Sequence, residues 1–373
     1  MDQVHPVNGK PESINPADLI REYSKVKTKP AYGHITEKAA ISALPRDMAD
    51  ISFKPDLKAQ NQTEEDYRKS LKAYESGLIS PGMMNASLET YFRTGGAEAR
   101  QETVEHLFGT DVELKARTAS LFAGIKNTGE ISPLDEAACD KALYCARDGL
   151  KKEPVSKTSY AGFMKTIGKM GESEDLPLLL DASKNAQQKS GEKSYFLQNT
   201  SVKAVKDLVE RKPEAVNKET KSGVSSMIVN SMNSNSREVR KNSASLLMKL
   251  SDNRDLTGTF TRMIKELPKN ENTAGALGLF ASNLQSGIPD RVTFTSLVLD
   301  KTMKGANNEF KYDLLSEATE RFGKYPPQGD MARDTAAILG RHYESLLDNK
   351  GKEAFKSLSP DEKIAKMTTH FHG

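Results

Sequence analysis

One pattern of five apolar or small residues constrains the fold of this chain more than any other feature. It occurs without gaps at residues 114–125, 197–208 and 239–250, and a looser copy occupies residues 310–322. In the first three copies the residues stand at positions i, i+4, i+5, i+8 and i+11, which form a single stripe along an α-helix, and in the looser copy the last residue stands one position later. The pattern therefore predicts a series of buried helices that belong to a repeated unit.

The middle of the pattern holds small residues, such as Ala119 and Ala244. A small side chain allows a neighbouring helix to approach closely, so each copy is predicted to be the second helix of a packed pair, with Ala244 buried and Ser245 exposed. A single copy would be weak evidence, because any amphipathic helix can match these positions. The turn residues Asp111 and Asn235, however, stand three or four positions before the pattern in two of the copies.

Residues 239–247 resemble the second helix of a HEAT repeat, in which a capped start and an apolar-basic pair lead to small residues and a closing leucine. Residues 167–180 look like the junction between two such repeats, because Gly171 can adopt the left-handed conformation that ends a helix and Pro177 suits the first turn of the next. The resemblance covers roughly residues 110–345. It implies an all-α fold, a right-handed α-α superhelix (HEAT-like solenoid) of the armadillo-like kind.

The composition of the chain and the distribution of its prolines predict how the rest of it is organised. Only 36% of the residues are hydrophobic and 28% are charged, which favours an elongated repeat array with much surface for each residue. Residues 1–62 contain six prolines and few clustered apolar residues, so we expect a largely disordered, mobile N-terminal arm. Helices are expected to begin at Thr63 and to form either a cap or a small separate domain over residues 63–109. The repeats would then occupy residues 110–345, followed by a capping helix and tail over residues 346–373.

The two cysteines and the first residues bear on where the protein works. Cys139 and Cys145 stand six positions apart on one predicted helix and point about 240° apart, so a disulfide between them is disfavoured. The first residues lack the basic and apolar regions of a secretory signal, and no apolar run reaches the ~18 residues of a membrane span. We therefore expect a soluble, cytoplasmic protein, while export without a cleaved signal stays open.

The sequence contains no motif of fixed spacing that is typical of catalysis or of cofactor binding. Glycine-rich phosphate loops, HExxH and GxSxG are all absent from it. Of the six histidines, His370 and His372 stand closest together, and without a third ligand nearby they predict adventitious metal affinity only. We expect neither enzyme activity, nor a cofactor, nor a metal site. An enzyme on a HEAT-like frame, such as a lyase, remains an alternative.

Basic residues are concentrated in the middle of the chain, although the formal net charge is only +3. Residues 184–269 contain seventeen Lys and Arg residues against nine Asp and Glu residues. On the predicted second helices, six of these cations fall outside the apolar positions and are expected to be exposed. We call them the basic ridge; they are Lys203, Lys206, Arg237, Arg240, Lys241 and Lys249.

The basic ridge leads to a functional hypothesis. We expect a non-enzymatic interaction scaffold that binds a macromolecular partner, with a protein that presents an acidic surface favoured. The alternative is a nucleic acid whose phosphate backbone lies along the basic ridge. Exposed Lys and Arg residues also keep helices soluble, so these charges alone identify neither the partner nor the oligomeric state.

Overall fold

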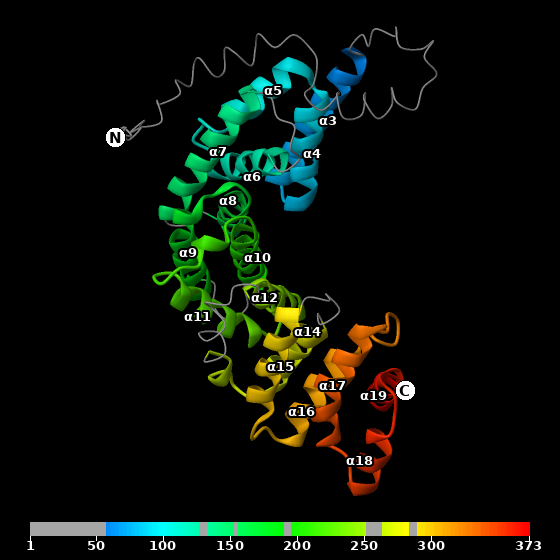
Figure 1. The fold of residues 1–373 in the computed structure, drawn as a ribbon. Coiled ribbons are helices and arrows are strands. Elements are labelled where there is room, and N and C mark those ends of the chain that lie inside the picture. Colours follow the sequence, from blue (N-terminus) through cyan, green and yellow to red (C-terminus); the bar gives the residue numbers. More distant parts are fainter. Residues whose placement is uncertain (1–56, 127–132, 153–155, 190–194, 251–262, 283–288) are drawn as a thin grey trace, which may run out of the picture. The chain divides into compact units, whose positions relative to one another are not determined.

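The computed structural model describes residues 57–126, 133–152, 156–189, 195–250, 263–282 and 289–373 (Figure 1). Within these ranges every regular element is a helix, and no strand occurs. The chain divides into two compact units, residues 1–170 and 171–373. In each unit the helices pack on near neighbours in the sequence, as the predicted all-α superhelix requires. The arm predicted for residues 1–62 lies outside the described residues up to residue 56.

The first unit is built around one central helix. Its described helices are α3 (Leu57–Glu75), α4 (Pro81–Thr94), α5 (Gly96–Glu105), α6 (Val112–Lys126), α7 (Pro133–Lys151) and α8 (Lys157–Met170). α6 packs against both α7 and α8, and its Phe122 meets Phe92 edge to face with the ring centroids 5.3 Å apart. α6 and α8 approach closely because Gly162 has no side chain. A Cβ atom at Gly162 would lie 2.9 Å from the carbonyl oxygen of Ala116.

The helical region begins earlier than the sequence analysis predicts. α3 begins at Leu57, and Thr63, the expected start, lies inside this helix. The residues between them are mostly good helix formers, so the capping signal at Thr63 is overridden. Arg68 of α3 donates to both carboxylate oxygens of Glu102, on α5, at 2.5 and 2.7 Å. The helices α3 to α5 belong to the same compact unit as α6.

The second unit arranges its helices in layers. Its described helices are α9 (Leu176–Lys189), α10 (Tyr195–Arg211), α11 (Lys221–Met232), α12 (Arg237–Leu250), α14 (Glu271–Ala281), α15 (Pro289–Met303), α16 (Asn308–Thr319), α17 (Asp330–Glu344), α18 (Asn349–Lys356) and α19 (Pro360–His372). Two short 3-10 turns, η2 (Ser173–Asp175) and η4 (Pro213–Ala215), precede α9 and α11. α10, α12, α14 and α16 pack in succession and form a layer of second helices. The first helices α9 and α11 pack on α10 and α12 and lie to their left in Figure 1.

The repeat pattern predicted from the sequence coincides with helices of the structure. The four copies fall on α6, α10, α12 and α16, except that Phe322 of the last copy lies in the turn after α16. Every patterned residue is buried except Leu114, which is half-buried. Further copies that the sequence search missed lie on α8, at Ser159, Phe163, Met164, Ile167 and Met170, and on α14, at Thr273, Leu277, Gly278 and Ala281. Both begin with a small polar residue, so the first position of the pattern does not stand out as apolar.

Two local predictions are wrong, although Ala244 is buried as expected. Ser245 is half-buried rather than exposed, because α10, α11 and α14 all pack against α12 and leave little of its surface open. Gly171 is not among the glycines with a positive φ. The chain instead passes from α8 into an extended Glu172, whose side chain forms a capping box with Asp175 at the start of η2.

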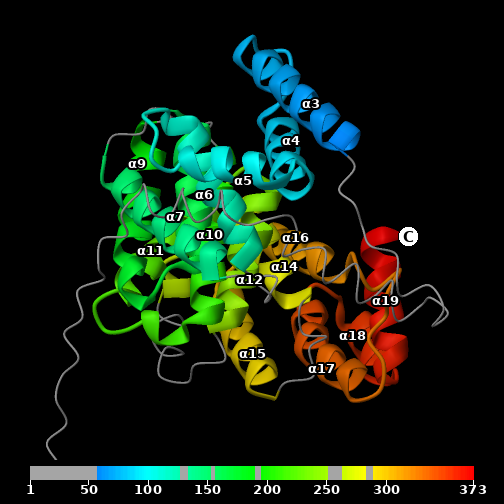
Figure 2. The ribbon, with the colours of Figure 1, turned by 90° about the horizontal axis from the view of Figure 1, so that it is seen from above.

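The C-terminal residues form two helices instead of one capping helix and a tail. α18 and α19 follow α17, and α19 continues as far as His372. α19 packs on both α16 and α17, and the three last helices lie together in Figure 2. The ring of His370 meets the rings of Tyr343 and Tyr312 at centroid distances of 5.2 and 6.1 Å. These aromatic contacts hold α19 against the end of the layer of second helices.

Candidate binding surface

The structure brings the six cations of the basic ridge together on neighbouring helices. α10 carries two of them and α12, which packs against α10, carries four. The cations that are exposed, as predicted, are Lys203, Arg237 and Lys241. The prediction of exposure is wrong for the other three, which are half-buried: Lys206, Arg240 and Lys249. Arg240 and Lys249 lose exposure because they contact the neighbouring helices α14 and α10.

Two lysines of the basic ridge form ion pairs between α10 and α12. Lys203 Nζ, on α10, lies 3.6 Å from Glu238 Oε1, on α12. Lys249 Nζ, on α12, lies 2.5 Å from Glu210 Oε1, on α10. Each helix therefore offers one cation and one anion to the other. An ammonium group that is already paired adds less attraction for an acidic partner than a free one does.

Arg237 reaches past α14 to α16. Its Nη2 donates to Glu317 Oε1 at 2.6 Å, and the same guanidinium also donates to Glu320. The hydrogen bond to Glu317 raises the pKa of Arg237 above its usual value. The approach of α14 to α16 that permits this contact depends on Gly278, where a Cβ atom would lie 2.6 Å from Glu317 Cβ. Arg237 is thus exposed but already bound to two carboxylates.

Arg240 joins α12 to the start of α14. Its Nη1 donates to the carbonyl oxygen of Ser234 at 2.8 Å and to Asn272 Oδ1 at 3.1 Å. The guanidinium lies against Gly275, where a Cβ atom would be 3.5 Å from Nε. Burial lowers the pKa of Arg240 below its usual value. The fold itself therefore uses Arg240, which the sequence analysis had assigned to partner binding.

Carboxylates replace cations farther along the same layer. Glu271 begins α14, and Glu309 and Asp313 lie on α16. Burial, and then the charges of Glu271 and Glu309, raise the pKa of Asp313 above its usual value. On the basic side, Lys206 and Lys241 have no ion-pair partner among the described residues. We define the second-helix surface as the charged residues of α10, α12, α14 and α16, which are mainly basic on α10 and α12 and acidic on α16.

Asparagine side chains also join successive turns of this layer, a feature that the sequence analysis missed. Asn270 Nδ2 donates to Asn233 Oδ1 at 2.8 Å, and Asn272 Nδ2 donates to Asn235 Oδ1 at 2.7 Å. Both pairs are separated by 37 residues, so a search for Asn-x-Asn at equal spacing would have found them. The paired amides hold the turn before α12 against the turn before α14.

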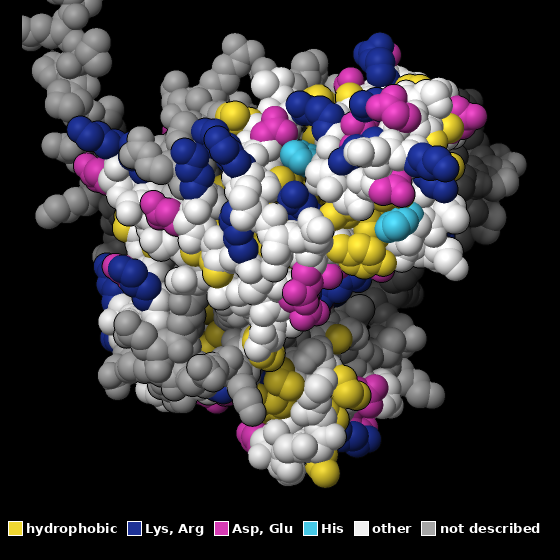
Figure 3. Space-filling model, turned by 90° about the horizontal axis from the view of Figure 1, so that it is seen from below, with side chains coloured by type: hydrophobic (Ala, Val, Ile, Leu, Met, Phe, Trp, Pro, Cys, Tyr) yellow, Lys and Arg dark blue, Asp and Glu magenta, His cyan; other side chains and the backbone are white. Residues whose placement is uncertain are grey.

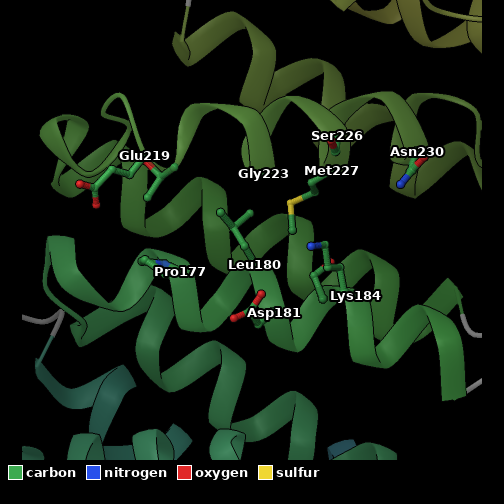
Figure 4. A pocket seen from close by; sticks show the side chains of 11 residues that line it. Pro177, Leu180, Asp181, Lys184, Glu219, Gly223, Ser226, Met227 and Asn230 are labelled. Atoms are coloured by element: carbon green, nitrogen blue, oxygen red, sulfur yellow. The ribbon is translucent and has the colours of Figure 1, made fainter.

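A groove of about 410 Å³ lies between the first helices α9 and α11, outside the layer of second helices. Figure 4 shows Leu180 and Met227 in the middle of the groove, with Lys184 farther along α9 and Glu219 near the start of α11. Asp181 stands beside Leu180 on the α9 side. The sequence analysis did not predict this site, because neither helix carries the repeated pattern.

Metal binding and membrane insertion can each be checked against the side chains and helices of the described parts of the chain. No group of three or more His, Cys, Asp or Glu side chains within them is arranged to hold a metal ion. His372 Nε2 lies 2.9 Å from the carbonyl oxygen of Ser316, so this ring packs on α16. None of the described helices combines the length and apolar character needed to cross a membrane. On the face drawn in Figure 3, basic and acidic side chains are interspersed.

Comparison of the chain with protein-family models, with curated proteins and with solved structures finds no match.

Proposed function

We propose that this protein is a non-enzymatic scaffold of the HEAT-like type, which binds a protein partner through its second-helix surface. The observation that carries the proposal is that one layer of packed helices presents unpaired charges of both signs. Lys206 and Lys241 provide the positive charges, and Glu309 and Asp313 provide the negative ones. A partner that matches this surface presents acidic residues to α10 and α12 and basic residues to α16.

The acidic part of the surface favours a protein over a nucleic acid. Duplex DNA carries one negative charge for every ~1.7 Å of its axis, so a phosphate backbone that crosses the layer from α10 to α16 would be repelled by the carboxylates of α16. Glu210 and Glu238 reduce the positive potential of the basic ridge further, because each of them pairs with one of its lysines. A protein surface can present both signs at the required positions.

The bonds between helices support the proposal because they restrict the surface before any partner binds. Arg237, Arg240 and the paired asparagines join α12 to α14 and α16. Side chains that are already ordered lose less conformational entropy on association, and less of the binding energy is then used to order them. The same bonds explain why charge reversal at Arg240 is a poor test of binding, since it would also disturb the fold.

The cytoplasmic location expected from the sequence remains part of this proposal.

The test uses the full chain and a protein that co-purifies with it, whose affinity is measured by titration calorimetry. Reversal of the two unpaired lysines, in the double variant Lys206→Glu and Lys241→Glu, should weaken binding by about tenfold or more, mainly through slower association at low salt. Lys350→Glu is the control, because this exposed lysine lies on α18, away from the four helices. If the unchanged chain, the double variant and the control variant all bound the partner with equal affinity, the assignment of the second-helix surface would be refuted.

A nucleic acid partner would give a different result. Affinity for a generic duplex would then fall steeply with salt, and the double variant would reduce the slope of log affinity against log salt by about 0.9 for each phosphate that is no longer neutralised. That outcome would replace the protein partner by a nucleic acid at the same surface.

A further inference from the structure

We propose that the groove between α9 and α11 is a second docking site, which binds a short peptide segment that carries an aliphatic side chain next to a lysine or arginine. The site lies on the first helices and uses none of the charged residues of the second-helix surface. It therefore extends the proposed function and does not depend on it.

The middle of the groove is apolar. Leu180 of α9 and Met227 of α11 face each other there (Figure 4). Gly223 allows Leu180 to rest directly on the backbone of α11, because a Cβ atom at Gly223 would lie 2.8 Å from Leu180 Cδ1. An aliphatic side chain that enters this space removes apolar surface of both helices from water, which is the main source of affinity in such a site.

The rim of the groove carries charges that the protein does not neutralise. Asp181, Lys184 and Glu219 are exposed, and none of them has an ion-pair partner within the described residues. On the second helices, by contrast, Lys203 and Lys249 are both paired. Two carboxylates and one ammonium group leave a net negative rim. A ligand with a basic residue beside its apolar one is therefore the complementary partner.

The two buried hydroxyl groups in the walls of the groove are already hydrogen-bonded within the protein. Ser183 Oγ donates to Ser201 Oγ at 3.2 Å, and Thr220 Oγ1 donates to the carbonyl oxygen of Ala215 at 2.6 Å. A site for a small polar molecule needs several buried polar groups that point at the ligand. Here the buried hydroxyl groups bond elsewhere, so recognition depends on the apolar floor and the charged rim, which suits a peptide.

The length of the groove also fits a peptide segment. The residues that line it on the α11 side run from Glu219 to Asn230. At 1.5 Å per residue this run is about 16 Å long, and about five residues of extended chain cover that distance. The volume of about 410 Å³ is within the range of sites that hold a few side chains. One aliphatic anchor and one or two flanking residues would fill it.

The experiment starts with a phage-displayed library of random seven-residue peptides, selected on the full chain. The expected result is enrichment of Leu, Ile or Met next to Lys or Arg. A fluorescein-labelled synthetic peptide of the enriched sequence is then titrated by fluorescence anisotropy. The double variant Asp181→Lys and Glu219→Lys should weaken its binding by about tenfold or more. Gly223→Met, which pushes a side chain into the groove, should abolish binding.

The double variant Lys206→Glu and Lys241→Glu is the matched control, and the peptide should bind to it as it binds to the unchanged chain. This control separates the groove from the second-helix surface, so that either assignment can fail while the other stands. The proposal would be overturned if the library enriched acidic or purely polar peptides. It would also be overturned if the selected peptide bound equally well to the unchanged chain and to the double variant at Asp181 and Glu219. These two rim residues are exposed, so their variants decide the question even if Gly223→Met does not fold.

Discussion

Two glycines of α14, three positions apart, should respond in opposite directions to the same substitution. At Gly278 a Cβ atom would lie 2.6 Å from both Glu317 Cβ and the carbonyl oxygen of Leu314. It would also lie 3.0 Å from the backbone nitrogen of Ala318, so α16 has to move away as a body. At Gly275 the nearest atom is Arg240 Nε at 3.5 Å, which is an ordinary contact.

The magnitudes follow from two opposing effects. Replacing glycine by alanine inside a helix stabilises it by about 1 kcal/mol, because alanine loses less backbone entropy on folding. Overpacking costs about 1–3 kcal/mol. We therefore expect Gly275→Ala to raise the free energy of unfolding by about 0.5–1 kcal/mol. Gly278→Ala should lower it by about 1–2 kcal/mol, since backbone atoms of α16 are among its contacts.

Differential scanning calorimetry of the full chain measures both effects. For a unit of about 200 residues, 1 kcal/mol corresponds to roughly 2–4 °C in Tm, so the expected difference of about 1.5–3 kcal/mol between the two variants corresponds to about 3–12 °C. Gly278→Ala should also weaken binding at the second-helix surface, because it displaces Glu317 and so disturbs the ion pair with Arg237. Equal Tm values for the two variants would show that α14 and α16 are not packed backbone to backbone at Gly278.

Three further predictions concern single side chains. Burial raises the pKa of Cys139 to about 12 and also raises that of Cys145. Neither thiol should therefore react with Ellman's reagent at pH 8 until the protein is unfolded. Rapid reaction of the folded protein would contradict the burial of these thiols. Arg240→Ala should lower the free energy of unfolding, measured by chemical denaturation, by about 1–3 kcal/mol, because it removes the hydrogen bonds to Ser234 and Asn272. Lys241→Ala should change it by less than about 0.5 kcal/mol. Similar losses in the two variants would refute the structural role of the arginine. Burial lowers the pKa of His342 below its usual value near 6.5. As the pH falls, the unfolded state therefore binds a proton at this group before the folded state does, and the free energy of unfolding should decrease below about pH 6.5. The contribution of this one group is at most about 1.4 kcal/mol per pH unit. His342→Gln should reduce this acid-side slope, and an unchanged slope would exclude the group as its source.

The fold class was predictable from the sequence because helical periodicity is a local property. The stripe at residues 239–250 specifies which face of α12 is buried, and all five patterned residues are buried in the structure. The copies on α8 and α14 escaped notice because Ser159 and Thr273 replace an apolar residue at the first position. A buried hydroxyl group on a helix looks the same in the sequence as an exposed one, and only packing distinguishes the two.

The candidate site was only partly predictable. The sequence indicated that the basic residues gather on two second helices, and the structure places those helices side by side. It did not indicate the groove, because α9 and α11 lie more than thirty positions apart and their juxtaposition depends on how each packs on a second helix. It also missed the paired asparagines at the turns.

By itself, the sequence determined the helices, their buried faces and the concentration of basic charge between residues 184 and 269. Only the tertiary structure decided which of those charges are free. Arg237 and Lys241 lie on the same helix and are both exposed, yet Arg237 is bound to Glu317, which stands 80 positions away in the chain. A helical pattern specifies the direction in which a side chain points. Whether that side chain meets a carboxylate or water depends on which residue the neighbouring helix places opposite it, and that contact exists only after the layer has formed.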